Sequence, residues 1–254
     1  DTAKLTTDIS CAKDKDIVLV GIPVKFVREV CNQAKPYVSK ESIMVSTSKG
    51  LEDGSMKRMS EILKEVFPDN TVAVLTGPSH AEELGRGIPT AVVVASESIE
   101  AAKLIQKTFS DNVLRLYVNS DVIGCEIGGA IKNVIALCCG VIEGLGLGDN
   151  TRAALMTRGL SEITRLGTAM GGKADTFSGL AGVGDLIVTC TSMHSRNFRA
   201  GILIGQGVSP QEAVFRDGTV EGYACAAAAL KLSKKYDVNM PITEEINRIL
   251  FEGK

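Results

Sequence analysis

Short apolar runs alternate with amphipathic helical patterns over the first 118 residues of the chain. Continuous apolar runs are typical of strands that are buried on both faces, and the helices between them would cover those faces. The alternation predicts a doubly wound α/β domain with a parallel sheet. The expected strands are residues 16–22, 42–46, 71–75, 90–95 and 113–117, and the expected helices are residues 25–34, 56–66 and 99–109.

The pattern changes near Val118, where long helical patterns joined by glycine-rich segments begin. We therefore expect two domains, a sheet-containing domain of residues 1–118 and an all-helical domain of residues 119–254. The expected helices of the second domain are residues 121–144, 151–167, 195–205 and 220–236.

Charge and cysteine content argue against several classes of protein. A formal net charge of -2 gives no electrostatic basis for binding nucleic acid or an anionic membrane, and the apolar runs look too short to span a bilayer. The seven cysteines include no Cys-x-x-Cys pair, which suits the reducing cytoplasm. Neither histidine has a second histidine or cysteine at ligand spacing, so no metal is predicted. We expect chemistry on a small molecule.

One lysine, Lys132, lies in the middle of an apolar helical pattern, in the segment EIGGAIKN of residues 126–133. A helical wheel places it beside small residues such as Cys125, Gly128 and Ala136, away from the core face. Adjacent glycines inside a helix cost about 1 kcal/mol each relative to alanine, so a backbone or a ligand should approach this side closely. A lysine on a solvated face is the commoner interpretation. The small neighbours favour Lys132 as a proton acceptor.

Polar segments follow two of the expected strands. Lys49 lies in the first segment and is a candidate contact to an anion or hydroxyl group, because ligands bind beyond the carboxyl ends of strands in open α/β sheets. In the second segment, Ser79 is expected to cap a short helix whose free amides could hold a ligand. A plain polar turn is the alternative for such segments.

Two further segments lie in the helical half. Residues 178–185 form an expected glycine-rich loop that ends at Asp185. Ser195, Arg196 and Asn197 open a helix, where a capping serine, a bidentate arginine and free amides predict a phosphate site. A capped helix with a surface arginine is the alternative. The glycines of residues 144–148 do not have the Gly-x-Gly-x-x-Gly spacing, and they follow a helix where the dinucleotide fingerprint requires a strand. The chain therefore contains no recognisable dinucleotide fingerprint.

Six segments, taken in order, resemble one family: the NAD(P)-dependent glycerol-3-phosphate dehydrogenases of the bacterial type. That family joins a Rossmann-like N-terminal domain to an all-helical C-terminal domain. It interconverts sn-glycerol 3-phosphate and dihydroxyacetone phosphate for phospholipid synthesis. The segments are residues 48–52 (SKGLE), 77–82 (GPSHAE), 128–133 (GGAIKN), 179–186 (GLAGVGDL), 195–197 (SRN) and 220–222 (VEG).

The resemblance implies a role for each matching residue. Lys132 would be the general acid and base, taking the C2 hydroxyl proton while a hydride passes to the nicotinamide. It also implies binding of a small phosphorylated substrate and of NAD or NADP. The substrate contacts would be Lys49, Gly77, Ser79, Lys132, Asp185, Ser195, Arg196 and Asn197, and the cofactor contacts would be Lys49, Ala81, Arg196 and Glu221.

Family members begin with a strand and a Gly-x-Gly loop before the point that matches residue 1, and they continue beyond the last residue. The resemblance therefore implies an incomplete Rossmann-like sheet, without the first β-α-β unit, and weakened binding of NAD or NADP. Activity of this chain by itself is left open, as is assembly into a homodimer.

Two other functions also remain open. One is another lysine-dependent hydroxy-acid dehydrogenase of the same fold group. The other is a non-catalytic module that binds glycerol phosphate or serves in assembly.

Overall fold

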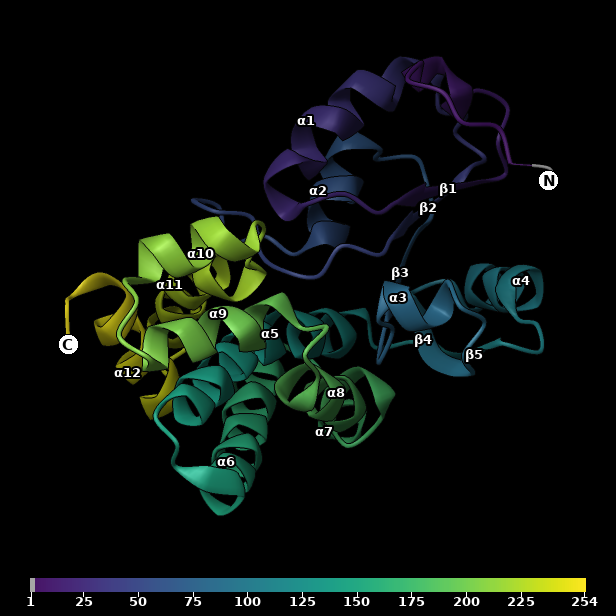
Figure 1. Ribbon diagram of the computed structural model, residues 1–254. Helices are drawn as coiled ribbons and strands as arrows, with labels where there is room; N and C mark the ends of the chain where they lie inside the picture. Colours follow the sequence, from purple (N-terminus) through teal and green to yellow (C-terminus); the bar gives the residue numbers. More distant parts are fainter. Residues whose placement is uncertain (1–2) are drawn as a thin grey trace.

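The computed structural model describes residues 3–254, in which a five-stranded sheet with its helices is followed by a helical half (Figure 1). The strands lie across the sheet in chain order, with β1 and β5 at its edges. All five expected strands form, and their bounds agree with the prediction to within two residues. They are β1 (Ile17–Val20), β2 (Ile43–Ser46), β3 (Val72–Thr76), β4 (Thr90–Ser96) and β5 (Leu114–Asn119).

The prediction of a wholly parallel sheet is wrong for one pair of strands. β4 runs antiparallel to β3, with Thr76 opposite Val93 and Ala73 opposite Ser96, whereas the other neighbouring pairs are parallel. The connection between β3 and β4 contains only the one-turn helix α3 (Ala81–Leu84). A parallel crossover usually needs a helix that returns along the length of the sheet, and this connection has none.

Helices cover both faces of the sheet, as the doubly wound prediction requires. Met44 of β2 packs with Val27 and Ile62 on one face, and the next residue, Val45, packs with Ile105 on the other. This alternation follows from the two-residue period of a strand. The helices of this half are η1 (Ile9–Ala12), α1 (Val24–Ala34), η2 (Lys35–Tyr37), α2 (Met59–Val66), the short α3, and α4 (Ile99–Phe109), with Ile105 in α4.

The helical half is built around one long helix, α5, which packs against the helices that follow it. Its side chains are buried on both sides, so the prediction that Lys132 lies away from the core is wrong. The helices of this half are α5 (Val122–Gly144), α6 (Gly148–Ala169), α7 (Ala174–Phe177), the π-helical turn η3 (Leu180–Gly184), α8 (Asp185–Thr191), α9 (Arg196–Gly205), α10 (Pro210–Asp217), α11 (Glu221–Lys235) and α12 (Pro241–Phe251).

Two features of this half differ from the prediction. Residues 178–185 are not a loop, because η3 runs directly into α8 and makes Asp185 the first residue of that helix. The prediction also lacks the short helices α7 and α8, and it lacks α10 and α12, each of which begins at a proline. The four long helices that were predicted form α5, α6, α9 and α11.

Among the described residues, one helix, α5, is long and apolar enough to cross a membrane, contrary to the prediction that no apolar run is long enough. In the fold, 83% of its most apolar window is buried inside the protein. The apolar character of α5 is therefore explained by its place in the core of the helical half.

Helices α5 and α9 approach each other so closely that only glycine fits at their contact. A Cβ atom on Gly140 would lie 2.8 Å from the Cα of Gly201, and one on Gly144 would lie 3.0 Å from the Cα of Gly205. In each helix the two glycines are four residues apart and so lie on one face. This contact fixes where the first turn of α9 lies relative to α5.

We expect Gly201→Ala to destabilise the protein by about 1–3 kcal/mol, because the added methyl group overlaps the carbonyl oxygen of Leu137 and forces the helices apart. Urea unfolding measures the change. Gly184→Ala is the matched control, since its Cβ atom would have no neighbour closer than 3.6 Å and the backbone is already helical. Equal stability of the two variants would contradict the packing argument.

Candidate active site

A cavity of about 740 Å³ lies between the carboxyl ends of β1, β2 and β3 and the helical half. This is the edge of an open α/β sheet at which ligands bind. Two predicted site residues, Gly77 and Asp185, do not line the cavity but bind Lys49 from behind it. The other predicted site residues all line it: Lys49, Ser79, Ala81, Lys132, Ser195, Arg196, Asn197 and Glu221.

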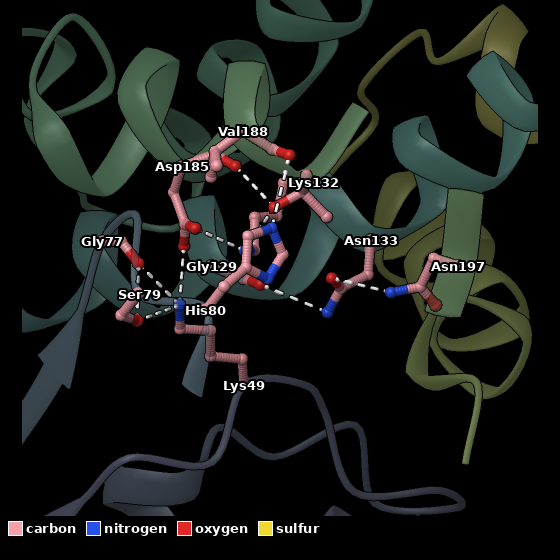
Figure 2. A network of polar contacts seen from close by, with 11 residues as sticks. Lys49, Gly77, Ser79, His80, Gly129, Lys132, Asn133, Asp185, Val188 and Asn197 are labelled. Atoms are coloured by element: carbon pink, nitrogen blue, oxygen red, sulfur yellow. Dashed lines mark hydrogen bonds and ion pairs between the residues drawn. The ribbon is translucent and has the colours of Figure 1, made fainter. Parts of the chain in front are cut away.

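Lys132 lies at the inner end of this cavity with only 5% of its surface exposed. Its Nζ donates hydrogen bonds to Asp185 Oδ1 at 2.5 Å and to Thr189 Oγ1 at 2.7 Å (Figure 2). Burial lowers the pKa of Lys132 to about 8, and the charge of Lys49 acts in the same direction, whereas Asp185 opposes the shift. The amine is therefore partly neutral near physiological pH.

The predicted close approach to α5 is made by protein backbone. A Cβ atom on Gly128 would overlap the carbonyl oxygen of Ala181 in η3. Because η3 continues into α8, this contact lets α8 lie against α5. Gly128 thus helps to bring Asp185 and Thr189 within reach of Lys132.

Lys49 and Lys132 share one carboxylate. Asp185 is 1% exposed, and its second oxygen, Oδ2, accepts a hydrogen bond from Lys49 Nζ at 3.0 Å. Lys49 also donates to the carbonyl oxygen of Gly77 at 2.8 Å and to Ser79 Oγ at 3.3 Å, so each of its three N–H groups has an acceptor (Figure 2). The Asp185 carboxylate therefore lies between two lysine side chains, with one lysine bound to each of its oxygens.

Ser79 does not cap a helix, which corrects the prediction. The N-cap of α3 is His80, and no side chain caps it. The Ser79 hydroxyl instead donates to the carbonyl oxygen of Gly77 at 2.9 Å and accepts from Lys49. The nearby ammonium group and carbonyl group hold this side chain in the loop, away from the amides of α3.

The first turn of α9 points at the cavity. Ser195 is the N-cap, and its Oγ accepts a hydrogen bond from the amide of Phe198 at 3.2 Å, as predicted. The next residue, Arg196, is exposed and lines the cavity. The first amides of a helix have no intrahelical acceptors, and they carry the positive end of its dipole. Arg196 and these amides together could hold an anion.

Asn197 is buried in a chain of amides that joins three helices. Its Nδ2 donates to Asn133 Oδ1 at 3.1 Å (Figure 2). Its Oδ1 accepts from the amide of Gly222 at 2.8 Å. Asn133 is the neighbour of Lys132 on α5, and Gly222 lies in the first turn of α11. Asn197 therefore holds α9 and α11 in place beside Lys132.

Glu221 lies where the two halves of the chain meet. Its Oε1 is 3.5 Å from the amide nitrogen of Val24, at the start of α1. Burial raises the pKa of the Glu221 carboxyl group, while the bond from the Val24 amide and the charge of Arg196 oppose this shift. The cavity wall beside it is formed by residues 21–23, which follow β1.

Sequence reasoning missed several residues that line the cavity. Thr189 lies four residues after Asp185 and thus on the same face of α8, but the sequence does not reveal this relation because the glycines before Asp185 predict a loop. His80 and His194 come from distant segments, and their ring centroids lie 5.7 Å apart. Burial lowers the pKa of His80. The proximity of these two rings has no signal in the sequence.

The arrangement combines a buried amine, which can exchange a proton near neutral pH, with an anion site on the adjacent helix. A small substrate that carries both a hydroxyl group and an anionic group would match these two features. Burial raises the pKa of the Cys190 thiol on α8, which disfavours its reactive thiolate form.

Two family models match the chain: the NAD-dependent glycerol-3-phosphate dehydrogenase N-terminus over residues 1–102 and the corresponding C-terminus over residues 121–254. A glycerol-3-phosphate dehydrogenase [NAD(P)+] from Bacillus subtilis is 52% identical over 256 residues, covering 99% of this chain and 74% of the relative. One from Thermoanaerobacter is 54% identical over 252 residues, covering 98% and 76%. The solved glycerol-3-phosphate dehydrogenase from Coxiella burnetii is 37% identical, with a TM-score of 0.90, and the match covers 94% of this chain and 74% of that structure.

Proposed function

We propose, since the chain belongs to the NAD-dependent glycerol-3-phosphate dehydrogenase family, that its cavity is the site where glycerol 3-phosphate and dihydroxyacetone phosphate are interconverted. The observation that carries the proposal is the position of Lys132, a buried amine with a lowered pKa beside the anion site of α9. Each residue role below is part of this proposal.

Lys132 moves the proton. Two of its hydrogen-bond positions are fixed by Asp185 and Thr189, so the remaining position of Nζ is free for a ligand in the cavity. In the oxidative direction, the neutral amine takes the proton from the C2 hydroxyl group of the substrate. In the reductive direction, the ammonium group returns a proton to the C2 oxygen.

The anion site holds the substrate. Arg196 presents a planar guanidinium group that can bond two phosphate oxygens, and the first amides of α9 add further donors. The three N–H groups of Lys49 already have protein acceptors. Lys49 therefore acts on the substrate through its positive charge. The substrate would thereby be oriented with its C2 toward Lys132.

The residues along the β1 side of the cavity fit a nicotinamide cofactor. Gly21 lets the loop after β2 pack closely there, because a Cβ atom on it would lie 2.9 Å from Thr47 Oγ1. Ile22 and Pro23 supply an apolar wall, and Glu221 and Arg196 supply polar groups. A volume of about 740 Å³ lies within the range of cofactor sites. When bound, NAD or NADP supplies the hydride acceptor or donor.

Oxidation of NADH and NADPH by dihydroxyacetone phosphate tests the proposal, measured for this chain and for the chain extended by a family-type Gly-x-Gly segment. We expect turnover with the phosphorylated substrate and none with unphosphorylated hydroxy or keto acids. A preference for the unphosphorylated acids would indicate a different dehydrogenase of this fold group. If neither form turns over but calorimetry detects glycerol 3-phosphate binding without cofactor, the chain is a binding module.

We also infer a cytoplasmic protein. All seven cysteines are free, and six of them are buried, as suits a reducing compartment. A homodimer and weakened cofactor binding stay predictions.

Replacing Lys132 by alanine should lower turnover at least about 100-fold, because the group that exchanges the substrate proton is lost. Asp185 keeps Lys49 as a partner in this variant, so the fold should survive. Steady-state kinetics measure the effect, and circular dichroism checks the fold. Lys64→Ala, which removes an exposed lysine of α2, is the control and should turn over normally. Near-normal turnover of Lys132→Ala would remove this lysine from the mechanism.

The two directions of the reaction should depend on pH with opposite sign. Oxidation needs neutral Lys132, so its kcat/KM should rise with pH and level off above about 8, whereas reduction needs the ammonium form and should fall above about 8. Asp185 raises the pKa of Lys132, so Asp185→Asn should move both midpoints to lower pH. Profiles of kcat/KM against pH measure this, and an upward shift would contradict the assigned coupling.

Arg196→Lys should raise the KM for glycerol 3-phosphate with a smaller change in kcat, because the planar fork that binds two phosphate oxygens is lost. Arg216→Lys, on the exposed face of α10, is the matched control and should leave KM unchanged. An unchanged KM in Arg196→Lys would place the phosphate elsewhere in the cavity.

A further inference from the structure

A second, much smaller cavity lies directly behind Lys49, where β3 meets the first turns of α5. Its volume is about 10 Å³, and it is enclosed by Thr76, Glu126 and Gly129 together with the Lys49 segment. Thr76 is 4% exposed, and within residues 3–254 its hydroxyl oxygen is the buried side-chain atom that has no hydrogen-bond partner. A buried hydroxyl group without a partner destabilises the fold, because it loses the hydrogen bonds that it makes with water in the unfolded chain.

Glu126 lines the same cavity and offers an acceptor. Its Oε2 accepts from Arg58 Nη1 at 2.7 Å and from Ser60 Oγ at 2.5 Å. Among the described residues, its Oε1 accepts from the amide of Ser60 alone, at 2.8 Å. A carboxylate oxygen has two lone pairs, so Oε1 can accept one more hydrogen bond. A donor and an acceptor thus face the same small space.

Gly129 keeps this space open. A Cβ atom on Gly129 would lie 2.8 Å from Thr76 Oγ1, and 3.7 Å and 3.8 Å from carbon atoms of the Lys49 side chain. Any other residue would therefore fill the gap between β3 and α5. The neighbouring Gly128 is explained by its contact with η3. Gly129 makes no such contact, so this small space accounts for its presence in the helix.

We propose that one ordered water molecule binds in this cavity, accepts the hydrogen bond of Thr76 and donates one to Glu126. The volume is about that of a single water-sized sphere, and the lining is polar enough to hold one. The bound water links the last residue of β3 to α5 and, through Glu126, to the first turn of α2. It therefore completes the wall against which Lys49 packs.

Crystallography of the protein and of two variants tests the proposal. We expect a density peak within hydrogen-bond distance of both Thr76 Oγ1 and the Glu126 carboxylate. The peak should persist in Thr76→Ser, which keeps the hydroxyl group, and disappear in Gly129→Ala, which occupies the space. A dry cavity in the unmodified protein would overturn the proposal, whether or not either variant folds.

The melting temperature of Thr76→Val gives an independent answer because its sign differs between the two cases. If the water is bound, Thr76→Val removes the hydroxyl group that donates a hydrogen bond to the water, and the Tm should fall by at least about 2 °C. Thr243→Val is the matched control, since that buried hydroxyl group bonds directly to the Glu162 carboxylate at 3.0 Å and its loss should also lower the Tm. An unchanged or raised Tm for Thr76→Val alone would mean that the hydroxyl faces a dry gap, and would overturn the proposal.

Discussion

The close contact between α5 and α9 decides where the chemical groups of this protein lie. Lys132 is carried by α5, and Arg196 begins α9, so the distance between the two helix axes sets the separation of the Lys132 amine and the first turn of α9. Glycine at residues 140, 144, 201 and 205 makes this contact one of backbone against backbone. A side chain at any of these positions would push α9 outward and enlarge the space between Lys132 and the first turn of α9.

The second determinant is the single carboxylate of Asp185. It accepts hydrogen bonds from Lys132 and Lys49, which come from α5 and from the loop after β2. Without this anion, two buried or half-buried ammonium groups would repel each other across a few ångströms. Asp185 therefore joins the sheet half to the helical half, and it also opposes the lowering of the Lys132 pKa that burial causes. The contact of Glu221 with the start of α1 joins the same two halves at the other end of the cavity.

Much of this arrangement could be predicted from the sequence, because apolar periodicity determines which segments become buried strands and helices. The direction of β4 could not, since it depends on a connection whose only helix is one turn long. The small neighbours of Lys132 pointed to a close approach on its side of α5, whereas Gly77 and Asp185, predicted as substrate contacts, lie behind Lys49 and do not line the cavity. Thr189 and the pair of His80 and His194 were missed, because their proximity arises only when η3, α8 and the loop after β3 pack together. The roles of the site residues remain proposals that the kinetic experiments address.

The lowered pKa of Lys132 has a thermodynamic consequence for the whole fold. The unfolded chain holds this proton with a pKa near 10.5, whereas the folded protein holds it with a pKa of about 8. The unfolded state therefore binds more protons between these values, and stability rises as the pH increases from 8 to 10.5. At neutral pH the burial of this lysine therefore makes the folded protein less stable than a lysine with its ordinary pKa would. The free energy of unfolding of such domains is only about 5–15 kcal/mol. The glycine-lined helix contact and the rest of the core must therefore supply the stability that the burial of Lys132 removes.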